Sequence, residues 1–165
     1  MEKRKKRLME ILGLPYWEDV SLTKFKEALL IFFSKAKKEV FMSTRLKSDF
    51  YNLPEIIESI TEKTDEGVLF RIVIDKDGQE PPDWMTKNNR IQTERSTVKI
   101  LQVIVIDNKH FMIESSSGSF RICYNVPVVV RVFKDDLQEI WDNHCEESPA
   151  KEVGKKEERR TPQKP

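Results

Sequence analysis

Apolar residues recur at intervals of three and four in four parts of the chain, which is the spacing that lines one face of an α-helix. These stretches cover residues 8–12, 22–36, 56–60 and 137–141. The second is the most regular, with Leu22, Phe25, Leu29, Phe32, Phe33 and Ala36 in step. We therefore expect four helices, the second being the best defined.

Residues typical of helix ends stand beside these stretches. Gly13 and Pro15 follow the first, because glycine favours a helix C-terminus and proline cannot continue one. Ser21 or Thr23 is a candidate N-cap for the second helix, and Asn52 is one for the third. Further signals are Gly67 after the third helix and the capping pair of Asp135 and Gln138 before the fourth.

Short apolar and β-branched runs predict strands between the helices. They are residues 39–43, 68–74, 101–106, 110–113, 120–124 and 128–133. Asp107, Asn108 and Lys109 separate the third run from the fourth, which is a strong hairpin signal. Pro127 lies between the last two runs and indicates an edge or a bulge there. The order of elements predicts an α/β fold with a mixed sheet flanked by helices.

At 165 residues the chain is long enough for one compact core. We expect a basic segment with a short helix over residues 1–20, one domain over 21–146 and a disordered charged tail over 147–165. Subtracting the +4 of residues 2–7 and the +3 of residues 151–165 from the net +1 leaves −6 for the rest. Attraction to nucleic acid would therefore come from the tails, chiefly Lys3, Arg4, Lys5, Lys6 and Arg7.

The compartment predicted from the sequence is the cytoplasm. Cys123 and Cys145 are the only cysteines, and the basic start is not followed by the long apolar run of a secretory signal. Charges such as Lys24, Lys35 and Arg71 interrupt every candidate membrane span. We expect no membrane association.

The order of elements and several segments resemble the phospholipase D-like fold, in the divergent form found in archaeal transcription regulators of the TrmB type. The segments are Ala36 to Met42, Gly67 to Ile74, Ile104 to Ile113 and Leu137 to Trp141. The resemblance spans about residues 23–143 and implies a half-domain. Because such halves pair to complete their cleft, it also implies a homodimer.

The family's catalytic motif is altered in this chain. In the family, a nucleophilic His and a phosphate-binding Lys two residues later precede an Asp and then Gly-Ser. Aligning that Asp with Asp107 places Ile100 at the His position, Gln102 at the Lys position, and Glu114 and Ser115 at Gly-Ser. Isoleucine cannot attack phosphorus, and glutamine carries no positive charge for phosphate. The resemblance therefore implies no catalytic residue.

Other groups with chemical potential have simpler interpretations. His110 lacks a lysine two residues later, and His144 with Cys145 cannot supply a tetrahedral metal set, so we expect no metal and no cofactor. Asp75 and Asp77 are typical of a turn after a strand, since further calcium ligands are missing.

The function predicted is a non-catalytic phospholipase D-like domain with a regulatory or binding role. It would act through a small ligand, a protein partner or self-association, and Gln102, Asp107 and Ser115 are the candidate cleft residues. Two alternatives stay open. One is a phosphodiesterase or nuclease with a rearranged site, and the other is a nucleic-acid-associated accessory protein.

Overall fold

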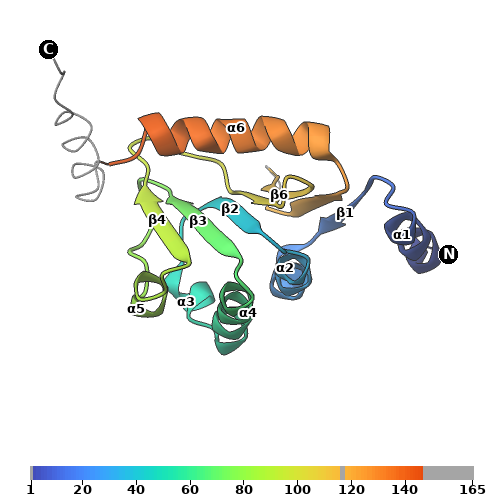
Figure 1. Ribbon diagram of the computed structural model, residues 1–165, viewed down its shortest axis with the longest axis horizontal. Helices are drawn as coiled ribbons and strands as arrows, with labels where there is room; N and C mark the ends of the chain where they lie inside the picture. The colour runs from blue at the N-terminus through green and yellow to red at the C-terminus, as the bar shows by residue number, and fades with distance from the viewer. Residues whose placement is uncertain (1, 116–117, 147–165) are drawn as a thin grey trace, which may run out of the picture.

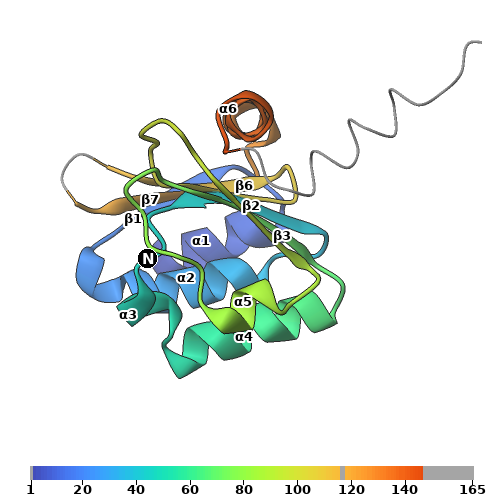
Figure 2. The same cartoon turned by 90° about the vertical axis from the view of Figure 1, so that its left-hand side faces the viewer.

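The computed structural model describes residues 2–115 and 118–146, and these residues form a mixed sheet with helices on both faces (Figures 1 and 2). The sheet has seven strands in the order β1-β7-β6-β5-β2-β3-β4. They are β1 (Tyr16–Val20), β2 (Glu39–Thr44), β3 (Leu69–Ile74), β4 (Ile91–Arg95), β5 (Val103–Ile106), β6 (His110–Glu114) and β7 (Phe120–Tyr124). The predicted α/β class is confirmed.

The directions of the strands divide the sheet in two. β2, β3 and β4 are parallel, while β5, β6, β7 and β1 continue from β2 as antiparallel neighbours. The carboxyl ends of β2 and β3 therefore lie at the same edge of the sheet as the start of β5 and the end of β6. That edge is where ligands bind in many open α/β sheets.

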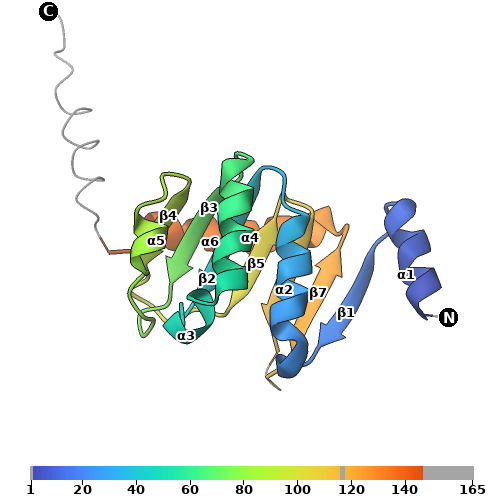
Figure 3. The same ribbon diagram turned by 90° about the horizontal axis from the view of Figure 1, so that it is seen from below.

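The helices form two layers. On one face lie α1 (Glu2–Ile11), α2 (Phe25–Ser34) after the 3₁₀ turn η1 (Leu22–Lys24), α3 (Ser48–Tyr51), α4 (Pro54–Asp65) and α5 (Asp83–Thr86). The other face carries α6 (Pro127–Asn143), which Figure 2 shows end-on. Figure 3 shows α2 and α4 lying across the sheet and α1 beyond its β1 edge.

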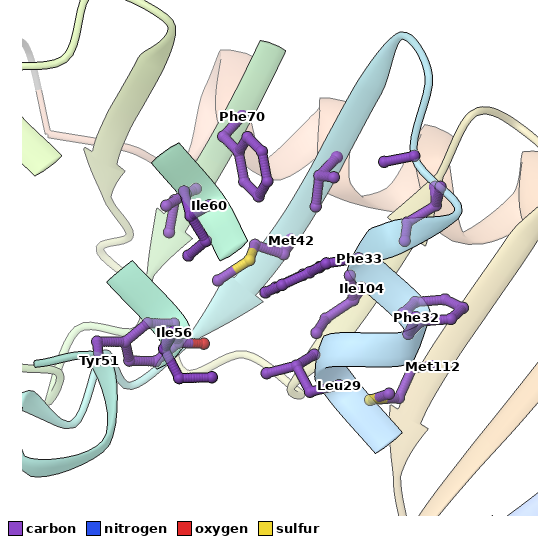
Figure 4. Packing of buried hydrophobic residues seen from close by; sticks show 14 of the residues in the cluster. Leu29, Phe32, Phe33, Met42, Tyr51, Ile56, Ile60, Phe70, Ile104 and Met112 are labelled. Carbon is purple, nitrogen blue, oxygen red and sulfur yellow. The ribbon is translucent and has the colours of Figure 1, made fainter. Parts of the chain in front are cut away.

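Successive side chains of each strand point to opposite faces of the sheet, so the buried residues form two cores, one on each face. On the α2 and α4 face, fully buried side chains interdigitate, among them Leu29, Phe33, Met42, Ile56, Phe70 and Ile104 (Figure 4). Under α6, the buried set includes Phe41, Val73, Val105, Phe111, Val130 and Leu137. The central strands β2, β3 and β5 are covered on both faces, which explains their nearly continuous apolar sequences.

The strand predicted over residues 128–133 is wrong, because these residues form the first half of α6. Pro127 occupies the first turn of that helix, where its missing N–H costs no hydrogen bond. Val130, Phe133 and Leu137 contact the sheet at helical spacing. Packing on the sheet thus outweighs the strand preference of the valines. The expected capping pair of Asp135 and Gln138 is also wrong, because both residues lie inside α6.

Two strands and two short helices, α3 and α5, lie where the sequence predicted none. β1 and β4 are the edge strands, and each is short and carries two charged residues, Glu18 and Asp19 in β1 and Glu94 and Arg95 in β4. Edge strands are commonly short and charged, which weakens the apolar signal used to find them. Pairing of β1 with β7 joins residues 16–20 to the same sheet as residues 21–146.

The remaining predicted elements are confirmed with small changes of boundary. Gly67 follows α4 with φ of 93°, and the Val68 N–H binds the Lys63 carbonyl at 3.0 Å, as expected of a glycine helix end. The predicted side-chain caps at Ser21, Thr23 and Asn52 are not formed. The predicted tail over 147–165 lies outside the described residues. No helix in the described ranges is long and apolar enough to cross a membrane.

Candidate functional site

A hollow opens where the carboxyl edge of β2 meets β5 and β6. It has a volume of about 250 Å³. Gln102 and Glu114 face each other there, since the Glu114 N–H binds the Gln102 carbonyl at 3.1 Å. The other lining residues are Leu22, Phe25, Thr44, Arg45, Lys47, Asp49, Phe50, Tyr51 and Phe120. We call this cavity the hollow.

A smaller cavity of about 50 Å³ adjoins the hollow. Thr44, Arg45, Gln102 and Glu114 line both, and Asp75, Ile100 and Leu101 line only the smaller one. The two cavities therefore form one recess with a shared polar wall. Three of the five positions aligned with the family motif, Ile100, Gln102 and Glu114, line this recess.

Aromatic side chains form the apolar wall of the hollow. The Phe25 ring stacks on Phe120 with centroids 3.9 Å apart and packs against Phe50 at 5.4 Å. Phe50 in turn meets the edge of Tyr51. Burial raises the pKa of Tyr51 to about 12, so its hydroxyl keeps its proton and donates to Thr44 Oγ1. The wall is thus aromatic and uncharged.

Arg45 and Lys47 reach the rim because of the backbone between them. Leu46 has φ of 49°, an uncommon conformation for a non-glycine residue, and its side chain is fully buried. Its N–H binds Thr44 Oγ1 at 3.1 Å, which holds this left-handed turn. With Leu46 pointing inward, its two basic neighbours stay exposed at the mouth of the hollow.

Asp75 is the most buried ionisable group of the recess, with 1% of its surface exposed. Its carboxylate accepts hydrogen bonds from the Ile100 N–H at 2.9 Å and the Asp77 N–H at 3.0 Å. Burial acts to raise the pKa of Asp75, but these hydrogen bonds and the charges of Arg45 and Lys99 outweigh it, so this pKa lies below its ordinary value. Asp75 is therefore a fixed negative charge beside Ile100.

The segment 96–102 between β4 and β5 forms one side of the recess and also contacts α6. Ser43 Oγ donates to the Leu101 carbonyl and accepts from the Val103 N–H at 3.0 Å. At the other end of the segment, the Thr97 N–H binds the His144 carbonyl at 2.7 Å. The Ser43 hydroxyl and the Asp75 carboxylate thus fix the positions of Ile100 and Gln102.

Asp107 does not line either cavity. It lies in the turn between β5 and β6, at the end of the hairpin opposite Gln102 and Glu114. Its carboxylate accepts hydrogen bonds from three consecutive backbone N–H groups, those of Lys37, Lys38 and Glu39, at 2.7 to 2.9 Å. Asp107 therefore joins the hairpin to the start of β2, whereas it was expected in the cleft.

The other candidate residues also lie away from the recess. Ser115 is outside both linings, and its hydroxyl bonds with that of Ser119 at 2.7 Å. His110 begins β6 at the Asp107 end, and its Nδ1 accepts from the Asn125 N–H at 3.1 Å. Burial, followed by the charges of Lys109 and Lys35, lowers the pKa of His110 to about 4. His110 is thus neutral at pH 7 and distant from Ile100.

The charges around the recess do not favour an anion. Arg45 and Lys47 are opposed by Asp49, Asp75 and Glu114, so the carboxylates outnumber the cations by one. In residues 2–115 and 118–146, no three His, Cys, Asp or Glu side chains gather closely enough to hold a metal ion. The residues present can hold a ligand by aromatic contact and hydrogen bonding.

Solved structures identify the fold. Nuc of Salmonella typhimurium, a phospholipase D family member, matches 81% of this chain over 99% of its own, with 17% identity and a TM-score of 0.61. NucT from Helicobacter pylori matches 79% over 98% of its own, with 13% identity and a TM-score of 0.59. The chain has the phospholipase D-like fold. No protein-family model and no curated protein matches its sequence.

The phospholipase D-like fold of this chain also resembles that of TrmBL2, an archaeal chromatin protein with a novel mode of DNA binding. This match covers 88% of the chain but 62% of TrmBL2, with 14% identity and a TM-score of 0.61. The expected likeness to the divergent, regulator-type form is therefore confirmed at the level of the fold. Asp75, Arg45 and Thr44 were missed by motif reasoning, although Asp75 directly follows a buried strand and so carries a signal.

Proposed function

We propose that this chain is a non-catalytic phospholipase D-like domain that binds a small ligand in the hollow, in a regulatory or binding role. One observation carries the proposal: Ile100 and Gln102, aligned with the family nucleophile and phosphate-binding lysine, line the same recess. The replaced catalytic positions therefore line an open cavity. A cavity without catalytic groups can still bind a ligand.

The chemistry of the recess argues against phosphodiester transfer. No histidine lines either cavity, so the described linings offer no imidazole nucleophile. Glu114 and the fixed charge of Asp75 would repel a phosphate that the family binds with lysine. Arg45 and Lys47 only partly offset these carboxylates.

The ligand favoured by the hollow is neutral or cationic and has one flat apolar face. Phe25, Phe50 and Phe120 offer aromatic surface, while Gln102 and Glu114 supply a donor and acceptors opposite them. Ligand sites commonly combine a mainly apolar wall with a few polar groups that fix orientation. Glu114 would bind a hydroxyl, an amine or an amide.

Two measurements test this function. Purified protein should not hydrolyse bis(p-nitrophenyl) phosphate or plasmid DNA, and a panel of nucleosides, neutral sugars and aromatic amines should contain a compound that raises its melting temperature. Gln102→Ala and Phe50→Ala should remove that rise, whereas Val132→Ala, on the opposite face, should retain it. Diester turnover that disappears on changing Gln102 or Glu114 would contradict the proposal.

Self-association belongs to the same proposal, because the resemblance implies halves that pair across the cleft. A homodimer would bring two hollows together and exclude water from them. Sedimentation of the full chain at high concentration measures this directly. A monomeric mass would contradict self-association. The ligand site would still be tested by the melting-temperature measurements.

A nucleic-acid-associated role is the second candidate. It is supported by the likeness to TrmBL2 and by four basic residues exposed on α1, Lys3, Arg4, Lys5 and Arg7. Binding of this kind weakens steeply as salt rises, because counterions are released from the phosphates. A gel shift with duplex DNA across a salt series tests this role. Binding whose affinity does not change with salt would count against the role.

A further inference from the structure

The first helix presents an apolar face to solvent. Leu8, Ile11 and Leu12, which directly follows α1 and whose N–H still binds the Leu8 carbonyl, share one side of the helix and are 56, 73 and 59% exposed. The opposite side holds α1 against the sheet, because Met9 packs on the core, Lys6 pairs with Glu18, and Glu10 pairs with Lys35. Folding therefore fixes the helix in place and leaves its apolar stripe uncovered.

Basic residues extend this stripe toward the N-terminus. Arg4 and Lys5 precede Leu8 by one helical turn, so they lie on the same outward side. Lys3, Arg4, Lys5 and Arg7 have no ion-pair partner among the described residues. The α1 outward face, which we define as Arg4, Lys5, Leu8, Ile11 and Leu12, is thus basic at one end and apolar at the other.

Two more exposed apolar side chains lie at this end of the molecule. Leu14 follows the helix, and Trp17 is 68% exposed on the edge strand β1, where it faces the α6 side because its neighbour Tyr16 faces the other core. α1 and β1 lie at the same end of the molecule (Figures 1 and 3). Tryptophan favours the boundary between water and lipid, because its ring is apolar and its N–H is polar. Five large apolar side chains therefore stand exposed within residues 8–17.

From these observations we propose that the α1 outward face binds the surface of an anionic lipid membrane. This departs from the expectation of no membrane association, because that expectation rested only on the lack of a spanning segment in the sequence. The basic end requires a negative counterpart and the apolar end requires an apolar one, and a lipid headgroup boundary supplies both side by side. A short amphipathic helix gains only weak, reversible attachment from either part alone. Binding should therefore need anionic lipid and the apolar stripe together.

Other occupants fit this face less well. A second copy would need about 800 Å² of buried surface on each partner for a stable interface, which is more than three helical turns offer. A symmetric contact between two α1 helices would also place basic residues against one another or against apolar ones. DNA would match Arg4 and Lys5 but would leave Leu8, Ile11 and Leu12 exposed.

Vesicle flotation tests the proposal. The full chain should float with vesicles of equal parts phosphatidylglycerol and phosphatidylcholine, and not with phosphatidylcholine alone. The double variant Ile11→Gln, Leu12→Gln should bind at least about tenfold more weakly, since two buried apolar side chains are lost. Val128→Gln is the matched control, because Val128 is 80% exposed on α6, across the sheet.

A second test removes positive charges from the α1 outward face. Arg4→Gln with Lys5→Gln should weaken binding by about fivefold per charge at low salt. Lys87→Gln with Arg90→Gln, two exposed basic residues near β4, should change it little. All these positions are exposed, so melting temperatures should match that of the wild type.

Several results would overturn the proposal. One is absence of flotation, and another is flotation unaffected by the Ile11 and Leu12 changes. A concentration-dependent dimer abolished by Ile11→Gln would assign the face to a second copy. DNA binding that needs Arg4 and Lys5 but not Ile11, without flotation, would assign it to nucleic acid.

Discussion

The Asp107 carboxylate accepts a hydrogen bond from the Lys38 N–H at 2.9 Å, across a sequence separation of 69 residues. It binds the neighbouring Lys37 and Glu39 N–H groups as well, so one side chain satisfies three backbone donors. Its own φ of 51° places it in a tight hairpin turn with Asn108, whose φ is 56°. Asp107, one of the two motif residues that persist in this chain, therefore supports the fold from the end of the hairpin remote from the recess.

Replacing Asp107 should destabilise the protein without affecting the hollow. Asp107→Ala removes the acceptor of three charge-assisted hydrogen bonds, and we expect the free energy of unfolding to fall by about 2–4 kcal/mol. Asp107→Asn keeps one acceptor oxygen and tolerates the left-handed backbone, so it should cost less. Urea denaturation measures both. Asp19→Ala, which breaks an exposed pair with Arg121, should cost far less, because solvent screens that pair.

Asp75→Asn should lower stability in a pH-dependent way. An amide cannot accept well from both N–H groups, so we expect a loss of about 1–3 kcal/mol at pH 7. Because folding lowers the pKa of Asp75, the stability that its carboxylate adds is present above the unfolded pKa and declines as pH falls through the folded one. The difference between wild type and variant should thus shrink below about pH 4. A constant difference from pH 7 to 3 would contradict this.

His110 should make the fold sensitive to mild acid. Its pKa is about 4 in the folded protein, below the ordinary value of 6.5. The unfolded chain therefore binds more protons between these values, and stability is lost as pH falls from about 6.5 toward 4. His110→Gln should flatten the dependence in this window, by up to about 1–3 kcal/mol. Urea denaturation at several pH values measures it, and an unchanged slope would refute it.

Two valines of α6 should respond in opposite directions. Val132 is exposed, so Val132→Ala should raise the free energy of unfolding by a few tenths of a kcal/mol, about the difference in helix propensity. Val130 is fully buried, and Val130→Ala should lower it by about 1–3 kcal/mol. Thermal melting distinguishes them. If Val132→Ala is destabilising, residues 128–133 behave as a strand and the helix assignment fails.

The sequence predicted the buried elements well because burial leaves a regular apolar pattern, one face of a helix or a nearly continuous run in a central strand. The hairpin of β5 and β6 carries both an apolar signal and turn chemistry at Asp107 and Asn108, and it was found. Val128 to Phe133 were misassigned because valine prefers strands locally, whereas the deciding contacts with Phe111 and Phe41 come from distant parts of the chain.

The recess was only partly predictable for a similar reason. Ile100 and Gln102 lie just before β5, and Glu114 ends β6, which follows β5 after a short turn, so a linear motif covers all three. Arg45 and Asp75 reach the same place from other strands, and only the order of the sheet brings them there. Asp107 lies within the motif by sequence, but four residues of strand carry it to the opposite end of the hairpin.

The segment 96–102 connects the hollow to the end of α6, through its own backbone and a hydrogen bond at Thr97. Gln102 touches the cavity at one end, and the Thr97 N–H holds the last turn of the helix through the His144 carbonyl at the other. Five peptide units separate Gln102 from Thr97, and hydrogen bonds with Asp75 and Ser43 hold two of them. If the proposed ligand displaced Gln102, this segment would connect that displacement to the end of α6 on the other face of the sheet.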